Sequence, residues 1–208
     1  MKNLSINLNT FNFIERESVN GKKMKNKCGR DFLYYAFTYY LPKKFNSQIN
    51  NPVLIDKNHL FGYPIHPDFS WTMIQFYKIP SLLKNLGLSL VINDRKIRNF
   101  LNFLILIIIP KKKTVGEAID EIEKVIDEGN VVGIDIPVGF FGLYNHIMFV
   151  YGYDEENLYI FDTQKIPILE YEKITEDYKY IMRLPKSIIK EKWGRFGRVW
   201  IVKKASTL

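Results

Sequence analysis

The feature that most constrains the fold is a capped amphipathic helix followed by a series of strand patterns. The segment TVGEAIDEIEKVIDEG, residues 114–129, has Thr114 and Glu117 at the spacing of a capping box, apolar residues along one face, and Gly129 as its stop. The patterns after it predict strands at residues 131–138, 146–153, 158–162, 178–184 and 198–203, with a short helix at 187–193. Helices combined with strands joined by tight turns predict an α+β fold with an antiparallel sheet.

A second helix is predicted in the N-terminal half. The segment GRDFLYYAFTYYL, residues 29–41, places large apolar side chains on one stripe, and Pro42 ends it. Cys28 therefore lies at the N-terminus of this helix. The chain from about residue 42 to 113 is less regular, and we interpret it as a variable insertion within a single domain that spans residues 1–208.

Shorter elements are predicted around this helix and inside the insertion. Alternating apolar residues predict a strand or arm over residues 6–13. Within the insertion, the patterns predict a helix at 80–86, a strand at 88–92, a helix at 94–104 with Asp94 as its N-cap, and a strand at 105–109.

Composition excludes several classes of protein. Of the 208 residues, 47% are hydrophobic and 25% are charged, which gives ample material for a core and argues against intrinsic disorder. The single cysteine, Cys28, excludes an intrachain disulfide, and with only three histidines the thiolate-rich zinc modules are excluded as well. We therefore expect no metal and no cofactor, and any function of Cys28 is that of a lone thiol.

The net charge of +8 favours acidic partners without identifying one. The basic residues form short scattered groups, with no arginine-rich helix and no recognisable binding module, so we expect no nucleic-acid partner. The most apolar run, residues 100–109, is about half of the ~20 residues that a membrane span requires, and the N-terminus lacks the apolar stretch of a secretory signal. We expect a cytoplasmic protein without a membrane span.

Three residues form a candidate catalytic constellation. Catalysis by cysteine needs a thiolate beside an imidazole, and a third group that orients the imidazole. Cys28 opens a helix, whose unpaired N–H groups favour the thiolate, and Lys25 and Lys27 act in the same direction. His146 begins a strand and Asp162 ends the next one, so a tight turn with a small offset or bulge brings them together. We expect Asp162 to accept the Nδ1–H of His146, so that Nε2 faces the sulfur.

A purely structural interpretation of these three residues is also open. Cys28 can pack as a small hydrophobe, His146 can be a satisfied strand residue, and Asp162 can cap a turn. The order of the three residues and their placement on the predicted elements favour the catalytic interpretation.

Other polar residues give weaker signals. Asp135, on the strand predicted at 131–138, either binds a substrate amine or occupies an edge or solvent-facing position. Asp154 and Asp135 are the alternatives to Asp162 as the orienting acid. His59 and His66 flank LFGYP without a carboxylate pair, which favours histidines of a surface loop over a metal site.

The segments NKCGRDFLYYAFTYYL, GNVVGIDIPV and NHIMFVYGYDEENLYIFDT resemble the papain-like cysteine peptidase superfamily, and most of all its bacterial leader-peptide (bacteriocin-processing) peptidase branch. The resemblance covers roughly residues 20–204. It implies Cys28 as the nucleophile, His146 as the general base and acid, and Asp162 as the orienting carboxylate. It also implies a papain-like fold, in which a helical half with the nucleophilic cysteine packs on an antiparallel sheet that carries the histidine and the aspartate.

One position departs from this family. The family usually supplies an oxyanion donor from a glutamine about six residues before the cysteine, where this chain has Lys22. Asn26 and Asn20 are the candidates to replace that donor. The long stretch between Cys28 and His146 is also similar to that of acyltransferases related to the N-terminal domain of the butirosin-pathway enzyme.

We therefore expect a cysteine-dependent hydrolase that cleaves an amide bond of a peptide through a thioester acyl-enzyme. The first alternative is an acyltransferase that uses the same triad on an acyl-thioester donor. The second alternative is a papain-like binding module without activity, because a fold does not determine a function.

Overall fold

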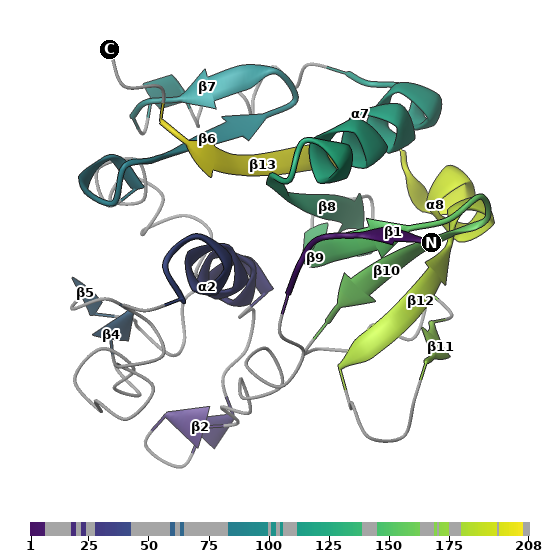
Figure 1. Ribbon diagram of the computed structural model, residues 1–208, viewed down its shortest axis with the longest axis horizontal. Coiled ribbons are helices and arrows are strands. Elements are labelled where there is room, and N and C mark those ends of the chain that lie inside the picture. Colours follow the sequence, from purple (N-terminus) through teal and green to yellow (C-terminus); the bar gives the residue numbers. More distant parts are fainter. Residues whose placement is uncertain are drawn as a thin grey trace.

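A large antiparallel sheet forms the centre of the molecule in the computed structural model (Figure 1). The structure describes residues 1–6, 18–19, 22–23, 28–42, 59–60, 63–64, 83–99, 101–102, 105, 112–138, 145–162, 169, 171–174, 180–194 and 196–205. Within these residues nine strands join in the order β11, β12, β10, β9, β8, β13, β6 and β7, with β1 beside the end of β9.

The strands of this sheet are β1 (Lys2–Asn3), β6 (Leu88–Ile92), β7 (Arg95–Ile97), β8 (Val131–Pro137), β9 (Asn145–Tyr153), β10 (Asn157–Phe161), β11 (Glu172–Lys173), β12 (Ile181–Pro185) and β13 (Arg198–Lys204). Two short hairpins pair separately from it: β2 (Ser18–Val19) with β3 (Lys22–Lys23), and β4 (His59–Leu60) with β5 (Tyr63–Pro64).

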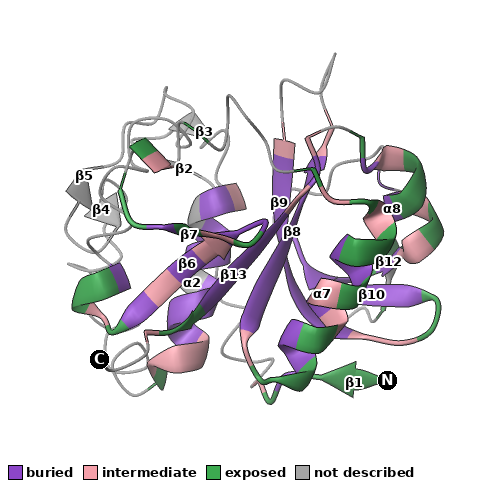
Figure 2. Cartoon of the chain, turned by 90° about the horizontal axis from the view of Figure 1, so that it is seen from above, coloured by how far each residue is buried: buried purple, intermediate pink, exposed green. Residues whose placement is uncertain are grey.

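Helices cover both faces of the sheet (Figure 1). Helix α7 (Val115–Asp127) lies on one face and helix α2 (Cys28–Tyr40) on the other, while α8 (Lys186–Lys192) follows β12. The strands between them, β8, β9 and β13, are buried along most of their length, as Figure 2 shows. The predicted α+β class with an antiparallel sheet is confirmed for the described residues.

Helix α7 forms as its sequence pattern predicts. The side chain of Thr114 accepts the N–H of Glu117, and the carboxylate of Glu117 accepts the N–H of Thr114 at 2.8 Å, which completes the capping box. The apolar stripe is buried: Ala118, Ile119, Ile122, Val125 and Ile126. Gly129 ends the helix with a positive φ of 70°, a conformation that glycine adopts at little cost.

Helix α2 runs antiparallel to β8, and its direction decides where the thiol lies. Near its C-terminal end, the hydroxyl of Tyr40 accepts the N–H of Val131, the first residue of β8. Nearer to the N-terminal end of the helix, the ring of Phe32 lies over Gly133 of β8. A Cβ added at Gly133 would come within 2.6 Å of this ring. The first residue of α2, Cys28, therefore lies at the end of the sheet where β8 ends and β9 begins.

Aromatic contacts fix α2 on the sheet. Tyr35 stacks on Phe161 of β10 with ring centroids 5.1 Å apart, and Phe32 meets Trp200 of β13 edge-on at 6.1 Å. Such pairs contribute about 0.5–1.5 kcal/mol each beyond the burial of their surface. Because these contacts reach strands on both sides of β8, they hold the helix, and Cys28 with it, in one position.

The predicted helix at 94–104 is wrong over its first part. Asn93 and Asp94 both have positive φ, 44° and 63°, and form the two-residue turn of a hairpin between β6 and β7, in which Ile92 pairs with Arg95. Asparagine and aspartate tolerate this left-handed conformation, which a two-residue hairpin requires. Asp94 is therefore a turn residue and not the N-cap that the sequence pattern predicts.

Most other predicted elements are confirmed. The strands predicted at 88–92, 131–138, 146–153, 158–162, 178–184 and 198–203 correspond to β6, β8, β9, β10, β12 and β13, and the helix predicted at 187–193 corresponds to α8. Ile105 is helical rather than extended, and residues 106–109 and 7–13 lie outside the described residues. In the parts of the chain that are described, no helix has both the length and the apolar character needed to cross a membrane.

The close approach of α2 to the sheet gives a test of this packing. Replacing Gly133 by alanine places a methyl group 2.6 Å from the Phe32 ring and 3.1 Å from the Met148 carbonyl oxygen, so we expect the free energy of unfolding to fall by about 1–3 kcal/mol. The control is Gly116→Ala in α7, where nothing lies within 4 Å, and which we expect to stabilise by about 0.5–1 kcal/mol. Urea unfolding of both variants measures the two changes, and equal effects would contradict the packing.

Candidate active site

A buried hydrogen bond joins His146 and Asp162. Nε2 of the imidazole lies 2.8 Å from Oδ2 of the carboxylate. The exposed fraction is 0% for His146 and 3% for Asp162. The predicted contact between these residues is confirmed, and its isolation from solvent strengthens the interaction between them.

The register of the sheet explains how the two residues meet. His146 is the second residue of β9, and Asp162 follows β10, the strand that pairs with β9. A bulge between Tyr159 and Ile160 shifts the register, and continuing the pairing beyond Phe161 sets Asp162 opposite Met148. Since side chains two apart on a strand share a face, His146 and Asp162 are diagonal neighbours on one side of the sheet. The predicted bulge is therefore present.

The nitrogen that faces the carboxylate differs from the expected one. The sequence-based prediction has Nδ1 donating to Asp162, but Nε2 makes that hydrogen bond. The physical reason is reach: Nε2 is the ring atom on the far side from the backbone, and the partner is a diagonal rather than a directly opposite residue. Nδ1 makes no conventional hydrogen bond with any described group.

Burial alone lowers the pKa of His146, but the charge and the hydrogen bond of Asp162, together with the thiol of Cys28, raise it to about 10. Two conclusions follow from these causes. The imidazole is protonated at neutral pH, so that Nε2–H donates to Asp162 and Nδ1 also carries a proton. The sulfur of Cys28 lies within interaction range of the ring.

Cys28 is the first residue of α2 and is half-buried against the core. A thiol in this position is neither sealed inside the core nor freely exposed. The first N–H groups of a helix have no partner within the helix and favour a negative charge beside them. The fold thus brings together the three residues of the predicted triad, Cys28, His146 and Asp162, at one end of the sheet.

Tyr171 also contacts Asp162, and sequence analysis did not identify it. Its hydroxyl donates to Oδ2 of Asp162 at 2.5 Å and lies 3.4 Å from the sulfur of Met148. The backbone N–H of Asp162 donates to the carbonyl of Tyr180, just before β12. No local pattern around Tyr171 signals this role, because only the pairing of β11, β12 and β10 brings its segment near Asp162.

Asp135 lies at the same end of the sheet but belongs to a buried network. Its Oδ2 accepts the indole N–H of Trp200 at 3.1 Å and forms an ion pair with Arg198 at 3.3 Å. Burial raises the pKa of Asp135, although Arg198, Trp200, Asn145 and His146 act in the opposite direction. With an exposed fraction of 3% on a central strand, the carboxylate does not occupy the edge or solvent-facing position that was one of the two expectations. It instead ties β8 to β13 beside the triad.

The structure gives little or nothing about the candidate oxyanion donors and the other two histidines. Asn20, Asn26 and His66 lie outside the described residues, and of Lys22 and His59 the structure gives only the backbone pairing in β3 and β4. Across the described ranges, no three side chains of histidine, cysteine, aspartate or glutamate gather as metal ligands would.

Asp154 does not compete with Asp162 as the orienting acid. It lies in the turn between β9 and β10, about 26 Å along β9 from His146 at the usual rise per residue. There it accepts the hydroxyl of Tyr159 and the N–H groups of Glu156 and Asn157, contacts that lower its pKa to about 2.

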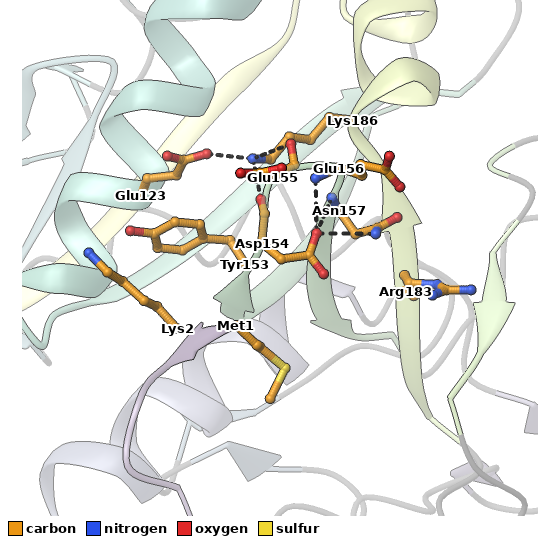
Figure 3. Close-up of a pocket in the computed structure, with 10 residues that line it drawn as sticks. All are labelled: Met1, Lys2, Glu123, Tyr153, Asp154, Glu155, Glu156, Asn157, Arg183 and Lys186. Carbon is orange, nitrogen blue, oxygen red and sulfur yellow. Dashed lines mark hydrogen bonds and ion pairs between the residues drawn. The ribbon is translucent and has the colours of Figure 1, made fainter.

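A cavity of about 660 Å³ opens beside this same turn and is therefore remote from the triad (Figure 3). On its wall, the amine of Lys186 contacts Glu123 at 2.6 Å and the backbone carbonyl of Asp154 at 2.5 Å. These contacts anchor the hairpin at the end opposite the triad.

Comparison of the whole chain with protein-family models, with curated proteins and with solved structures gives no match. The functional interpretation consequently rests on the geometry of the chain itself. That geometry comprises a helix-initial thiol, a buried imidazole and a buried carboxylate.

The raised pKa of His146 predicts how stability depends on pH. Because the folded value of about 10 exceeds the unfolded value of 6.5, protonation of His146 contributes fully to the free energy of unfolding below pH 6.5. The contribution is lost as the pH rises from 6.5 to about 10, with a slope of up to about 1.4 kcal/mol per pH unit. Urea unfolding across this range should show the loss in the wild-type protein and its absence in His146→Gln. Parallel curves would contradict the ion pair.

Proposed function

We propose that this protein is a cysteine-dependent hydrolase that cleaves an amide bond of a peptide by means of Cys28, His146 and Asp162. The observation that carries the proposal is the buried hydrogen bond between His146 and Asp162 beside the only thiol of the chain. A cysteine nucleophile requires a neighbouring imidazole that stabilises its thiolate. The protonated imidazole of His146, with Nδ1 unpaired and the thiol of Cys28 in range, meets this requirement.

In the first half of the reaction, the thiolate of Cys28 attacks the carbonyl carbon and forms the C–S bond. The carbonyl oxygen becomes an oxyanion, which the N–H groups at the start of α2 stabilise. When the C–N bond breaks, Nδ1–H of the His146 imidazolium gives its proton to the leaving nitrogen. The products are a neutral amine, a thioester on Cys28 and a neutral imidazole.

In the second half, His146 acts as the base. Its Nδ1 accepts a proton from water while the water oxygen attacks the thioester carbonyl. The C–S bond then breaks, which releases a carboxylic acid and restores the thiolate and the imidazolium. Asp162 remains ionised throughout and stabilises the imidazolium through Nε2.

A papain-like architecture is part of the proposal. The chain order is cysteine, helix, histidine strand and aspartate, and α2 with its cysteine packs on the antiparallel sheet that carries the other two residues. This arrangement supports the relationship that the sequence resemblance implies. The strands β6 and β7, which arise from the region between residues 42 and 113, extend that sheet beside β13.

Acyl transfer is the second candidate, favoured by Lys22 at the position where a glutamine oxyanion donor is expected. Loss of one such donor typically costs about 2.7–4 kcal/mol of transition-state stabilisation. A thioester opens more easily than an amide, so a weakened oxyanion hole suits an acyl-thioester donor better. The triad chemistry is unchanged except that an acceptor nucleophile replaces water.

The proposed mechanism predicts a reactive thiol. Because Cys28 is the only cysteine, intact-mass analysis reports its modification without ambiguity. We expect alkylation by iodoacetamide at pH 6 to be at least about tenfold faster in the wild-type protein than in His146→Asn, since the imidazolium stabilises the thiolate. Equal rates would remove the catalytic interpretation and leave the binding module.

The same mass analysis separates the two enzymatic candidates. A peptidase forms fragments from a panel of peptides and, after acid quenching, carries an acyl group on Cys28. An adduct formed only from acyl thioesters of N-acetylcysteamine, without cleavage of peptides, would favour the acyltransferase. Cys28→Ser serves as the control that fixes the site of the adduct.

A second prediction concerns the orienting acid. We expect Asp162→Asn to keep the fold and to lower the turnover number by at least about 100-fold, because an amide supports the imidazolium poorly. Asp154→Asn is a matched control, since Asp154 also accepts a tyrosine hydroxyl at 2.5 Å but lies at the remote end of the hairpin. Steady-state kinetics on a substrate identified above measures both, and equal losses would argue against a specific role of Asp162.

A further inference from the structure

Tyr171 holds the orienting carboxylate of the candidate site. We infer that Tyr171 is a positioning residue: its hydroxyl fixes the Asp162 side chain so that Oδ2 faces Nε2 of His146. The inference rests on the proposed function for its catalytic meaning. Its geometry, however, concerns the His146–Asp162 pair alone and can be measured without a substrate.

The two hydrogen bonds converge on one oxygen. Oδ2 of Asp162 accepts Nε2–H of His146 at 2.8 Å and the hydroxyl of Tyr171 at 2.5 Å. A carboxylate turns about its last single bond unless its oxygens are held, and its broad torsional preference supplies little restraint. Two donors on the same oxygen fix which oxygen faces the ring and also satisfy part of the hydrogen-bonding capacity of a buried anion.

The hydroxyl of Tyr171 is itself located by a second contact. It lies 3.4 Å from the sulfur of Met148, which shares a strand face with His146. A hydroxyl has one hydrogen, and an ionised carboxylate attracts it more strongly than a thioether sulfur does. The hydrogen therefore goes to Asp162, while the sulfur packs beside the oxygen.

The backbone and the side chain of Asp162 are held by different strands. Its N–H donates to the carbonyl of Tyr180 at 3.0 Å, which extends the pairing of β10 with β12 by one residue. Its carboxylate is held by Tyr171, which precedes β11 on the other side of β12. The orientation of His146 in β9 thus depends on a sheet edge three strands away.

The same kind of contact elsewhere in the chain provides a control. Tyr159 donates to Oδ2 of Asp154 at 2.5 Å, as Tyr171 does to Asp162. Asp154, however, has backbone N–H groups and an amide as its further partners, whereas Asp162 has a buried imidazole. Removing each hydroxyl separately therefore distinguishes an effect on the imidazole from a general effect of losing a tyrosine–carboxylate bond.

The experiment follows the Nε2 proton of His146 by NMR in the full-length protein labelled with ¹⁵N-histidine. Only three histidines contribute, and the absence of one signal in His146→Asn assigns it. In Tyr171→Phe we expect the proton to exchange with solvent about 10- to 100-fold faster, which is the effect of losing one hydrogen bond to a charged group. Alkylation of Cys28 at pH 6 should slow in the same variant. In Tyr159→Phe, both readouts should remain at the wild-type values.

The outcomes separate this inference from the proposed function. An unchanged Nε2 proton in folded Tyr171→Phe overturns the inference. Met148→Leu keeps the hydroxyl on Asp162, so an equal disturbance in that variant would also overturn it by assigning the effect to packing. If Tyr171→Phe disturbs the imidazole but the wild-type protein forms no acyl adduct on Cys28, the positioning stands and the proposed hydrolase does not.

Discussion

The rest of the site depends on one interaction, the buried ion pair between the imidazolium of His146 and the carboxylate of Asp162. Removing two charges from water costs several kcal/mol per ion, and their mutual attraction offsets this only if the geometry is good and their remaining groups are satisfied. The structure meets these conditions on the side of the carboxylate, with a 2.8 Å contact, a tyrosine donor and a backbone hydrogen bond from Asp162. The proton on Nδ1 makes no hydrogen bond with a described group, so it is the ring proton that can interact with the thiol of Cys28.

The position of α2 follows from a different set of forces. Its aromatic side chains pack against Phe149, Phe161 and Trp200, and a glycine on β8 lets the helix approach closely. These apolar contacts bring Cys28 to the end of the sheet, where its thiol interacts with His146. The candidate site thus combines a thiol that is located by hydrophobic packing with an imidazole that is located by strand register.

Much of this arrangement could be predicted from local patterns. The capping box at Thr114, the strands from residue 131 onward, and the helix that begins at Cys28 all follow from residue types at fixed spacing. The turn at Asn93 and Asp94 could not be distinguished from a helix start, because the same side chains favour both. The choice between Nδ1 and Nε2, and the contact with Tyr171, depend on diagonal placement and on the order of strands, which no local pattern contains.

The bulge in the hairpin of β9 and β10 has a consequence for how this chain tolerates insertions and deletions. Because successive side chains of a strand point to opposite faces, a one-residue deletion between His146 and Asp162 that slips the register turns the carboxylate away from the ring. No substitution at either residue restores the contact, since the displaced group lies on the wrong side of the sheet. The length of this hairpin is consequently constrained more strictly than its composition, and a compensating insertion must fall within the same hairpin.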